Sequence, residues 1–136
     1  MSVCTTCRVE DRVLVRIDSW GVPHGTSGHQ INHRWTSLSA CPQCETGRLV
    51  RFDHDCFHMP WEEPWDMAWS WWVAVDGVRR LKAALASCPD ALRPSCECPV
   101  HRSLRDSTDS SPSPEVQVTV MVTADGLPQV RQAPVP

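Results

Sequence analysis

The amino-acid sequence predicts a small α+β protein built on an antiparallel β-sheet, with one short helix and a tryptophan-rich second segment. Several short stretches alternate apolar and polar side chains, which is typical of half-buried strands. One stretch has helical spacing, and two Cys-x-x-Cys pairs lie about one small domain apart. With 136 residues, 41% of them hydrophobic, the chain is long enough for one domain with a modest core.

We expect three parts along the chain. Residues 1–102 form a metal-binding body, in which 1–55 make a first unit and 56–102 a tryptophan-rich segment with a second group of cysteines and histidine. Residues 103–115 are rich in Ser, Asp and Pro, which is typical of a linker. Residues 116–136 are a C-terminal strand and tail.

The first unit is expected to contain three strands. Val9–Asp18 alternates apolar with polar side chains, and Trp20–Gly28 is broken by glycine and proline and is expected to be a loop. Ile31–Ser37 and Arg48–Asp53 are the second and third strands. The order is therefore cysteine pair, strand, strand, cysteine pair, strand.

The two cysteine pairs, Cys4 with Cys7 and Cys41 with Cys44, predict one metal site. Two thiolates separated by two residues grip an ion from a single turn, and two such turns complete a tetrahedron around zinc. A redox Cys-x-x-Cys needs a βαβ context and a helix N-terminus that lowers the thiol pKa, and neither flanks these pairs. Four thiolates close the coordination sphere, so we expect a structural site.

This arrangement resembles the zinc-ribbon families over about the first 55 residues. The resemblance rests on the four cysteines and the strand pattern, with the usual glycine of the second turn displaced to Gly47. It implies a metal-held β-platform. Zinc ribbons serve too many functions for the resemblance to imply more.

The second segment is expected to hold a strand and then a helix. Met67–Val75 alternates, although its tryptophans also fit a helical stripe; we favour a strand because Asp76 and Gly77 follow as a break and Asp76 suits a helix N-cap. Val78–Ser87 then has helical spacing, and Pro89 ends it. Residues 88–101 are expected to form a compact loop. Five of the seven tryptophans lie between positions 61 and 72, and we expect most in the core and one or two lining a groove.

A second metal site is predicted from Cys56, Cys88, Cys96, Cys98 and His101. One possibility is a Cys₄ site made by the four cysteines. The other is a Cys₃His site from Cys88, Cys96, Cys98 and His101, with Cys56 left as a buried thiol. Isolated reduced cysteines behave as small hydrophobes, but this clustering favours a metal, so two zinc ions are expected in total.

The C-terminal segment Val116–Thr123 alternates along its whole length and is expected to be a strand. It must pair its backbone groups, either beside Met67–Val75 or in the sheet of a partner. We favour the first because an exposed row of valines invites aggregation. Leu127–Pro136 is expected to be a loose end.

Charge and composition bear on the partner. The formal net charge is −3, and the arginines at positions 8, 12 and 16 alternate with acidic residues, which argues against a nucleic-acid partner. The chain starts without a basic and apolar leader and contains no long apolar run, so we expect a cytoplasmic protein with no membrane partner.

The function predicted from these features is that of a small zinc-binding accessory or regulatory protein that acts through protein–protein binding. One alternative is a nucleic-acid-binding ribbon acting through Arg8, Arg12, Arg16, Arg34 and Arg51. Another is a metal-dependent hydrolase using histidines such as His24 or His29 with Asp55. The spacing of His29, Asn32 and His33 is too compressed for a His-Asn-His nuclease. No catalytic residue is assigned, and the balance is against an enzyme.

Overall fold

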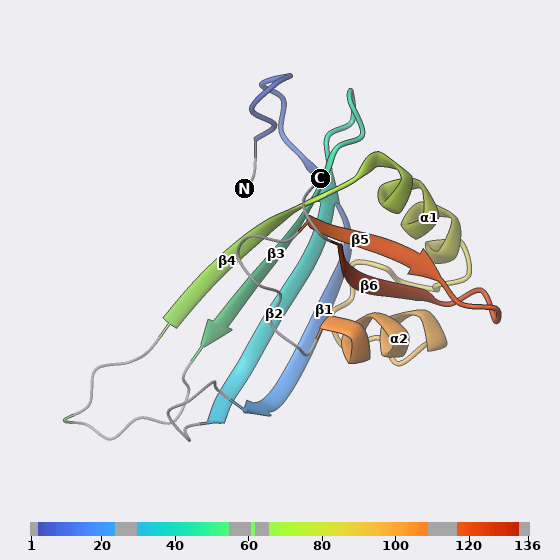
Figure 1. The fold of residues 1–136 in the computed structure, drawn as a ribbon. Helices are drawn as coiled ribbons and strands as arrows, with labels where there is room; N and C mark the ends of the chain where they lie inside the picture. The colour runs from blue at the N-terminus through green and yellow to red at the C-terminus, as the bar shows by residue number, and fades with distance from the viewer. Residues whose placement is uncertain (1–2, 24–29, 55–60, 62–65, 109–116, 134–136) are drawn as a thin grey trace.

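The protein is described by a computed structural model that covers residues 3–23, 30–54, 61, 66–108 and 117–133. It is a single six-stranded sheet with the strand order β1-β2-β3-β4-β5-β6, curled into a half-barrel with two helices (Figure 1). The strands are β1 (Arg12–Pro23), β2 (Gln30–Ala40), β3 (Gly47–His54), β4 (Asp66–Val73), β5 (Gln117–Val122) and β6 (Pro128–Ala133). The helices are α1 (Val75–Leu85) and α2 (Pro99–Thr108).

The first four strands form an antiparallel meander, and the chain then crosses over. After β4 it passes through α1, a loop and α2 before it returns as β5, which lies parallel to β4 and pairs Val118 with Val73. Strands β5 and β6 form an antiparallel hairpin that completes the sheet. The expected docking of the C-terminal strand beside the tryptophan-rich strand is therefore confirmed.

The prediction of a small zinc-ribbon-like sheet with one short helix is wrong. The sheet has six strands, and α2 and β6 were both missed. Residues 99–101 were expected to end a proline-containing loop, and residues 103–108 to belong to a linker rich in Ser, Asp and Pro. A ten-residue helix is marginal alone, and this one is stabilised by tertiary burial of Val100 and Leu104, which are 2% and 0% exposed.

The strand β6 lies in the segment expected to be a loose end. Pro128 begins it, and Val130 pairs with Val120 of β5. Its stability therefore depends on pairing with β5, which the short sequence of β6 alone does not predict. The division into body, linker and tail stays a prediction. Residues 103–108 of the expected linker lie in α2, and residues 109–115 lie outside the described residues.

One face of the sheet, here called the inner face, carries the hydrophobic core. Both helices and the C-terminal hairpin pack against its upper part, while β1–β4 extend beyond them (Figure 1). The core residues are Val15, Ile17, Leu38, Ala40, Leu49, Trp71, Val73, Val78, Leu81, Val100, Leu104, Val118, Val120 and Val130. The opposite face of β1–β4, here called the outer face, has neither helix against it.

The edge strand β1 is covered by the loop between the helices. The backbone N–H groups of Arg16 and Asp18 donate to the carbonyls of Ala91 (3.0 Å) and Pro94 (3.1 Å). The Nε of Arg105 in α2 donates to the carbonyl of Asp18 at 2.8 Å. Because α2 packs against both β1 and β6, it joins the two edges of the half-barrel and satisfies backbone groups that an open edge would leave unpaired.

A buried ionic cluster occupies the inner face of β2 and β3. The carboxylate of Asp53, 0% exposed, accepts from Arg34 Nε at 2.7 Å and from Arg34 Nη2 at 3.1 Å. Arg51 also approaches Asp53, at 3.5 Å, and its guanidinium lies 4.7 Å from the ring centre of Trp69 and 5.8 Å from that of Trp71. Shared hydrogen bonds make such a charge tolerable in the interior.

The tryptophans divide between the interior and the surface. Trp71 is buried and Trp69 packs against the core, whereas Trp61 and Trp72 are 77% and 48% exposed. Trp65 lies outside the described residues. Of the four that the structure describes, two therefore belong to the core and two are exposed, and the expectation for the whole group of five stays a prediction.

Gly77→Ala is expected to lower the melting temperature, although alanine favours helix. A Cβ at position 77 would lie 2.8 Å from the backbone nitrogen of Val120 and 3.0 Å from Thr119 Oγ1, so α1 would have to move away from β5. Such overpacking costs about 1–3 kcal/mol, against a propensity gain of at most about 1 kcal/mol. Thermal unfolding measures the balance.

Ala83→Gly is the matched control, because Ala83 lies on the exposed side of the same helix. It is expected to cost about 1 kcal/mol from helix propensity alone. If Gly77→Ala instead raised the melting temperature, the close approach of α1 to β5 would be wrong.

Candidate metal centres

The two Cys-x-x-Cys pairs occupy turns of the same design. In the N-terminal turn the N–H of Arg8 donates to the carbonyl of Cys4 at 2.8 Å, and between β2 and β3 the N–H of Glu45 donates to that of Cys41 at 3.0 Å. Arg8 and Glu45 have φ values of 55° and 61°, in the left-handed region that favours glycine. Gly47 does not serve this turn and instead begins β3.

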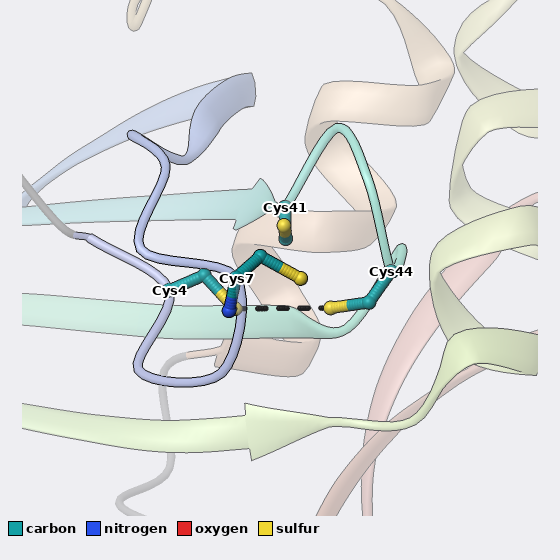
Figure 2. A group of neighbouring side chains, drawn as sticks. All are labelled: Cys4, Cys7, Cys41 and Cys44. Carbon is teal, nitrogen blue, oxygen red and sulfur yellow. Dashed lines mark hydrogen bonds between the residues drawn. The ribbon is translucent and has the colours of Figure 1, made fainter.

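The sulfurs of these pairs converge on one point from two sides (Figure 2). The Sγ atoms of Cys4, Cys7, Cys41 and Cys44 all lie within 4.8 Å of one another, and those of Cys4 and Cys44 are 3.7 Å apart. A tetrahedral zinc ion with bonds of about 2.3 Å holds its sulfurs about 3.8 Å apart. Backbone N–H groups also point at the sulfurs, including that of Gln43 toward Cys41 Sγ at 3.4 Å. This first group fits one metal ion.

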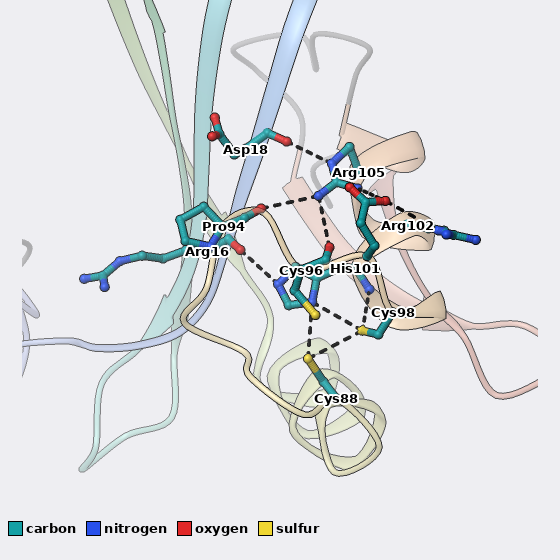
Figure 3. A network of polar contacts seen from close by, with 10 residues as sticks. Arg16, Asp18, Cys88, Pro94, Cys96, Cys98, His101, Arg102 and Arg105 are labelled. Carbon is teal, nitrogen blue, oxygen red and sulfur yellow. Dashed lines mark hydrogen bonds and ion pairs between the residues drawn. The ribbon is translucent and has the colours of Figure 1, made fainter.

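The second group gathers Cys88, Cys96, Cys98 and His101 around the loop that covers β1 (Figure 3). The Sγ atoms of Cys88 and Cys98 are 3.6 Å apart, and they lie 3.2 Å and 3.4 Å from Nδ1 of His101. The structure therefore assembles the Cys₃His alternative. Cys56, the fourth cysteine of the other alternative, lies outside the described residues.

A contact at Nε2 of His101 orients the imidazole ring so that the other nitrogen, Nδ1, can bind a metal ion. The side chain is 0% exposed, and Nε2 lies 3.1 Å from the backbone carbonyl of Arg16. A carbonyl only accepts, so this contact places the ring proton on Nε2 and leaves the lone pair of Nδ1 facing the sulfurs of Cys88 and Cys98. Orientation of a ligating imidazole by a backbone carbonyl is a recurrent feature of metal centres.

Crowding of the sulfurs separates their pKa values within each group. Burial raises the pKa of Cys7 and that of Cys88 to about 12. Hydrogen bonds from the side chain and backbone of Thr46 lower the pKa of Cys44 to about 6. Burial raises the pKa of Cys98, but the hydrogen bonds that its sulfur accepts, first among them that from the backbone N–H of His101, outweigh burial and bring the pKa to about 7. Each group thus places an easily ionised sulfur beside one that holds its proton, and a bound cation would displace that proton.

The second group also fastens the crossover to the sheet. Arg105 Nη2 donates to the carbonyls of Pro94 and Cys96 at 3.3 Å and 3.2 Å (Figure 3). The same guanidinium reaches the carbonyl of Asp18 in β1. A metal ion held here would fix the loop, α2 and the edge of the sheet together.

Both groups have donor sets compatible with zinc. Each supplies four protein atoms, four sulfurs in one case and three sulfurs with one nitrogen in the other. Four protein ligands fill a tetrahedron, whereas a catalytic zinc site keeps one position for water or substrate. The arrangement therefore suits a structural role.

Among the other polar residues considered for catalysis, His33 is one whose side chain the structure describes. His33 contacts Asp18 through Nε2 on the outer face and belongs to neither Cys/His group. His24, His29 and Asp55 lie outside the described residues.

Sequence reasoning missed an aromatic cluster on the outer face. Trp35 pairs with Phe52 across β2 and β3, and their ring centres are 5.4 Å apart. His33 and His54, one pair further along, have ring centres 3.8 Å and 5.8 Å from that of Trp35. The alternation places these rings on one face of each strand, but only the strand register shows that they meet.

No protein-family model, curated protein or solved structure matches this chain. Among the described residues, neither helix is long and apolar enough to cross a membrane.

Proposed function

We propose that this protein is a small zinc-binding accessory or regulatory protein that acts by binding another protein. One zinc ion in each Cys/His group stabilises the half-barrel, and the outer face of the sheet carries the interaction. The closed, four-ligand geometry of both groups supports a structural role for the metal.

The observation that carries the proposal is the exposed aromatic surface on the outer face. Trp35 and Trp72 are 39% and 48% exposed, although they lie on interior strands of the sheet. The Arg48 guanidinium lies 4.8 Å from the ring centre of Trp72. Trp and Arg are the residue types enriched at the energetic centres of protein interfaces.

The buried arginines weaken the nucleic-acid alternative. Arg34 and Arg51, two of the five arginines named for that role, are 2% exposed and lie against Asp53 on the inner face. They do not contribute to a basic surface. A Cys₄ and a Cys₃His zinc centre would also make the negative formal charge of −3 more negative.

The hydrolase alternative needs an open metal position. Both groups among the described residues supply four ligands, and His33 belongs to neither. The closed geometry of both groups therefore agrees better with a binding function than with a catalytic one.

The test is affinity capture from the native host, followed by reconstitution with the purified partner. The double variant Trp35→Ala with Trp72→Ala is expected to fold and to lose the partner. The double variant Leu92→Ala with Val122→Ala removes exposed apolar side chains outside the outer face of β1–β4, 47% and 42% exposed, and is expected to retain the partner. Equal binding by both variants would contradict the proposed surface.

A further inference from the structure

A pocket opens on the outer face where β1–β3 meet the metal-bearing loop. Its volume is about 240 Å³, and its walls include Trp35, Val50, Phe52 and Pro94, with Arg16 also among the lining residues. Pockets for drug-sized ligands have volumes of about 300–1,000 Å³, so this one suits a single ring system. Most of the wall is apolar, and the one charged group is a guanidinium.

The two aromatic walls are held side by side by the strand register. Trp35 and Phe52 face each other across β2 and β3 at a ring separation of 5.4 Å, tilted by 37°. The ring of Trp35 remains 39% exposed. Aromatic side chains favour offset or edge-to-face contact with a further ring, so this pair offers a preformed aromatic contact surface.

Arg16 is fixed at its backbone and open at its side chain. Its N–H donates to the carbonyl of Ala91 at 3.0 Å, and its own carbonyl lies 3.1 Å from Nε2 of His101. The side chain extends away from the Cys/His group, as Figure 3 shows. Within the described part of the chain Arg16 forms no ion pair, so its guanidinium is available to an anion from outside.

The outer face around this pocket is poor in carboxylates. Asp18 lies on the outer face of β1, where His33 is already in contact with it, and none of the residues that line the pocket is acidic. Arg16 and Arg48 lie on the same face. Although the whole chain is acidic, the charge beside the pocket therefore complements a negative group.

From these observations we infer that the pocket receives an aromatic side chain of the partner protein, while Arg16 binds the carboxylate of an acidic residue beside it in the partner sequence. The inference rests on the proposed function and names the chemistry that the partner presents. A guanidinium binds a carboxylate through two parallel hydrogen bonds, which adds geometric specificity to the apolar contact. A nucleotide is the less fitting occupant, because the chain carries a net charge of −3 and the pocket offers one cation.

This assignment gives the second metal group a direct part in recognition. Pro94 lies in the loop between Cys88 and Cys96, and the backbone of Arg16 contacts His101. A metal ion in the second group would thus fix the distance between Pro94, in the wall of the pocket, and the guanidinium of Arg16. Preorganisation of this kind reduces the entropy lost on binding.

The test uses the full-length wild-type protein, with the indole N–H signal of Trp35 followed by NMR during titration. The probe is the dipeptide acetyl-Trp-Asp-amide, compared with acetyl-Trp-Asn-amide, acetyl-Ala-Asp-amide and uridine 5′-monophosphate. We expect the first to shift the Trp35 signal, the Asn form to bind about tenfold more weakly and the Ala form not to bind, because ring and charge are both needed. Equal binding of the Asp and Asn forms, or tighter binding of the nucleotide, would overturn the inference.

Variants assign the two contacts. Arg16→Gln is expected to remove the preference for Asp over Asn, since it deletes the charge and keeps the backbone contacts, whereas Arg131→Gln on β6 leaves the preference unchanged. Trp35→Ala is expected to abolish binding, and Trp72→Ala, which lies outside the pocket, to preserve it. Should Trp35→Ala fail to fold, the wild-type titration still decides.

The two proposals fail in different ways. Loss of the captured partner in the Trp35 and Trp72 double variant, with no response to the Asp dipeptide, would reject the pocket chemistry and keep the binding function. A specific dipeptide response with a partner indifferent to that double variant would reject both the proposed binding surface and the assignment of the partner to the pocket, although the pocket itself would still bind an aromatic and acidic peptide.

Discussion

Cys41→Ser is expected to abolish folding of the isolated protein. Cys41 is 1% exposed, and its sulfur is one of the four that converge between the first two turns. A structural zinc ion contributes about 10–16 kcal/mol in small modules, while the net stability of a domain is only about 5–15 kcal/mol. Serine is a poor ligand for zinc at neutral pH, so most of that contribution is lost.

Circular dichroism and thermal unfolding measure this effect. Gln43→Ser is the matched control, because it introduces the same residue in the same turn at an exposed position whose side chain is not a ligand. The control is expected to unfold like wild type. A Cys41→Ser protein with the native spectrum and melting temperature would show that the first group does not hold the fold together.

Asp53→Ala is expected to give the second largest loss of stability, about 3–5 kcal/mol. It removes the carboxylate that Arg34 and Arg51 share on the inner face, where all three side chains are no more than 3% exposed. A buried cation that loses its counter-ion has no water to replace it. Urea unfolding at neutral pH measures the change.

Two further variants separate charge from burial in that experiment. Asp106→Ala, at an exposed position of α2, is expected to change stability by less than about 0.5 kcal/mol. The triple variant that replaces Arg34, Arg51 and Asp53 with apolar residues of similar volume is expected to recover much of the loss, because no charge is then left alone. A loss below about 1 kcal/mol for Asp53→Ala would contradict the role of this cluster.

Local pattern located the elements of the meander but not their full extent. Alternation placed strands within β1, β2, β3 and β4, because each strand has one buried and one more accessible face. It did not reveal α2, whose stability comes from burying Val100 and Leu104 in a core made by distant strands. It did not reveal β6 either, since a six-residue strand with Pro128 and few apolar residues depends on pairing with β5.

The candidate sites also differ in how far they could be predicted from the sequence, depending on whether short turns or contacts between distant segments form them. Cysteine spacing identified the first group in full, because both halves are short turns whose geometry is local. For the second group the spacing left two ligand sets open. The contact of His101 with Arg16, 85 residues earlier, brings the histidine into the group. The pocket beside Trp35 could not be predicted, since it depends on the register of β2 with β3 and on where the loop at Pro94 meets β1.

Two closed zinc centres are proposed to stabilise this half-barrel, and elemental analysis with zinc X-ray absorption tests this proposal most directly. Protein purified without added metal is expected to contain two zinc ions per chain, with a first shell dominated by sulfur and a minor nitrogen contribution from His101. One zinc ion per chain would remove one of the two centres. No zinc, iron in its place, or a shell rich in oxygen would contradict the account.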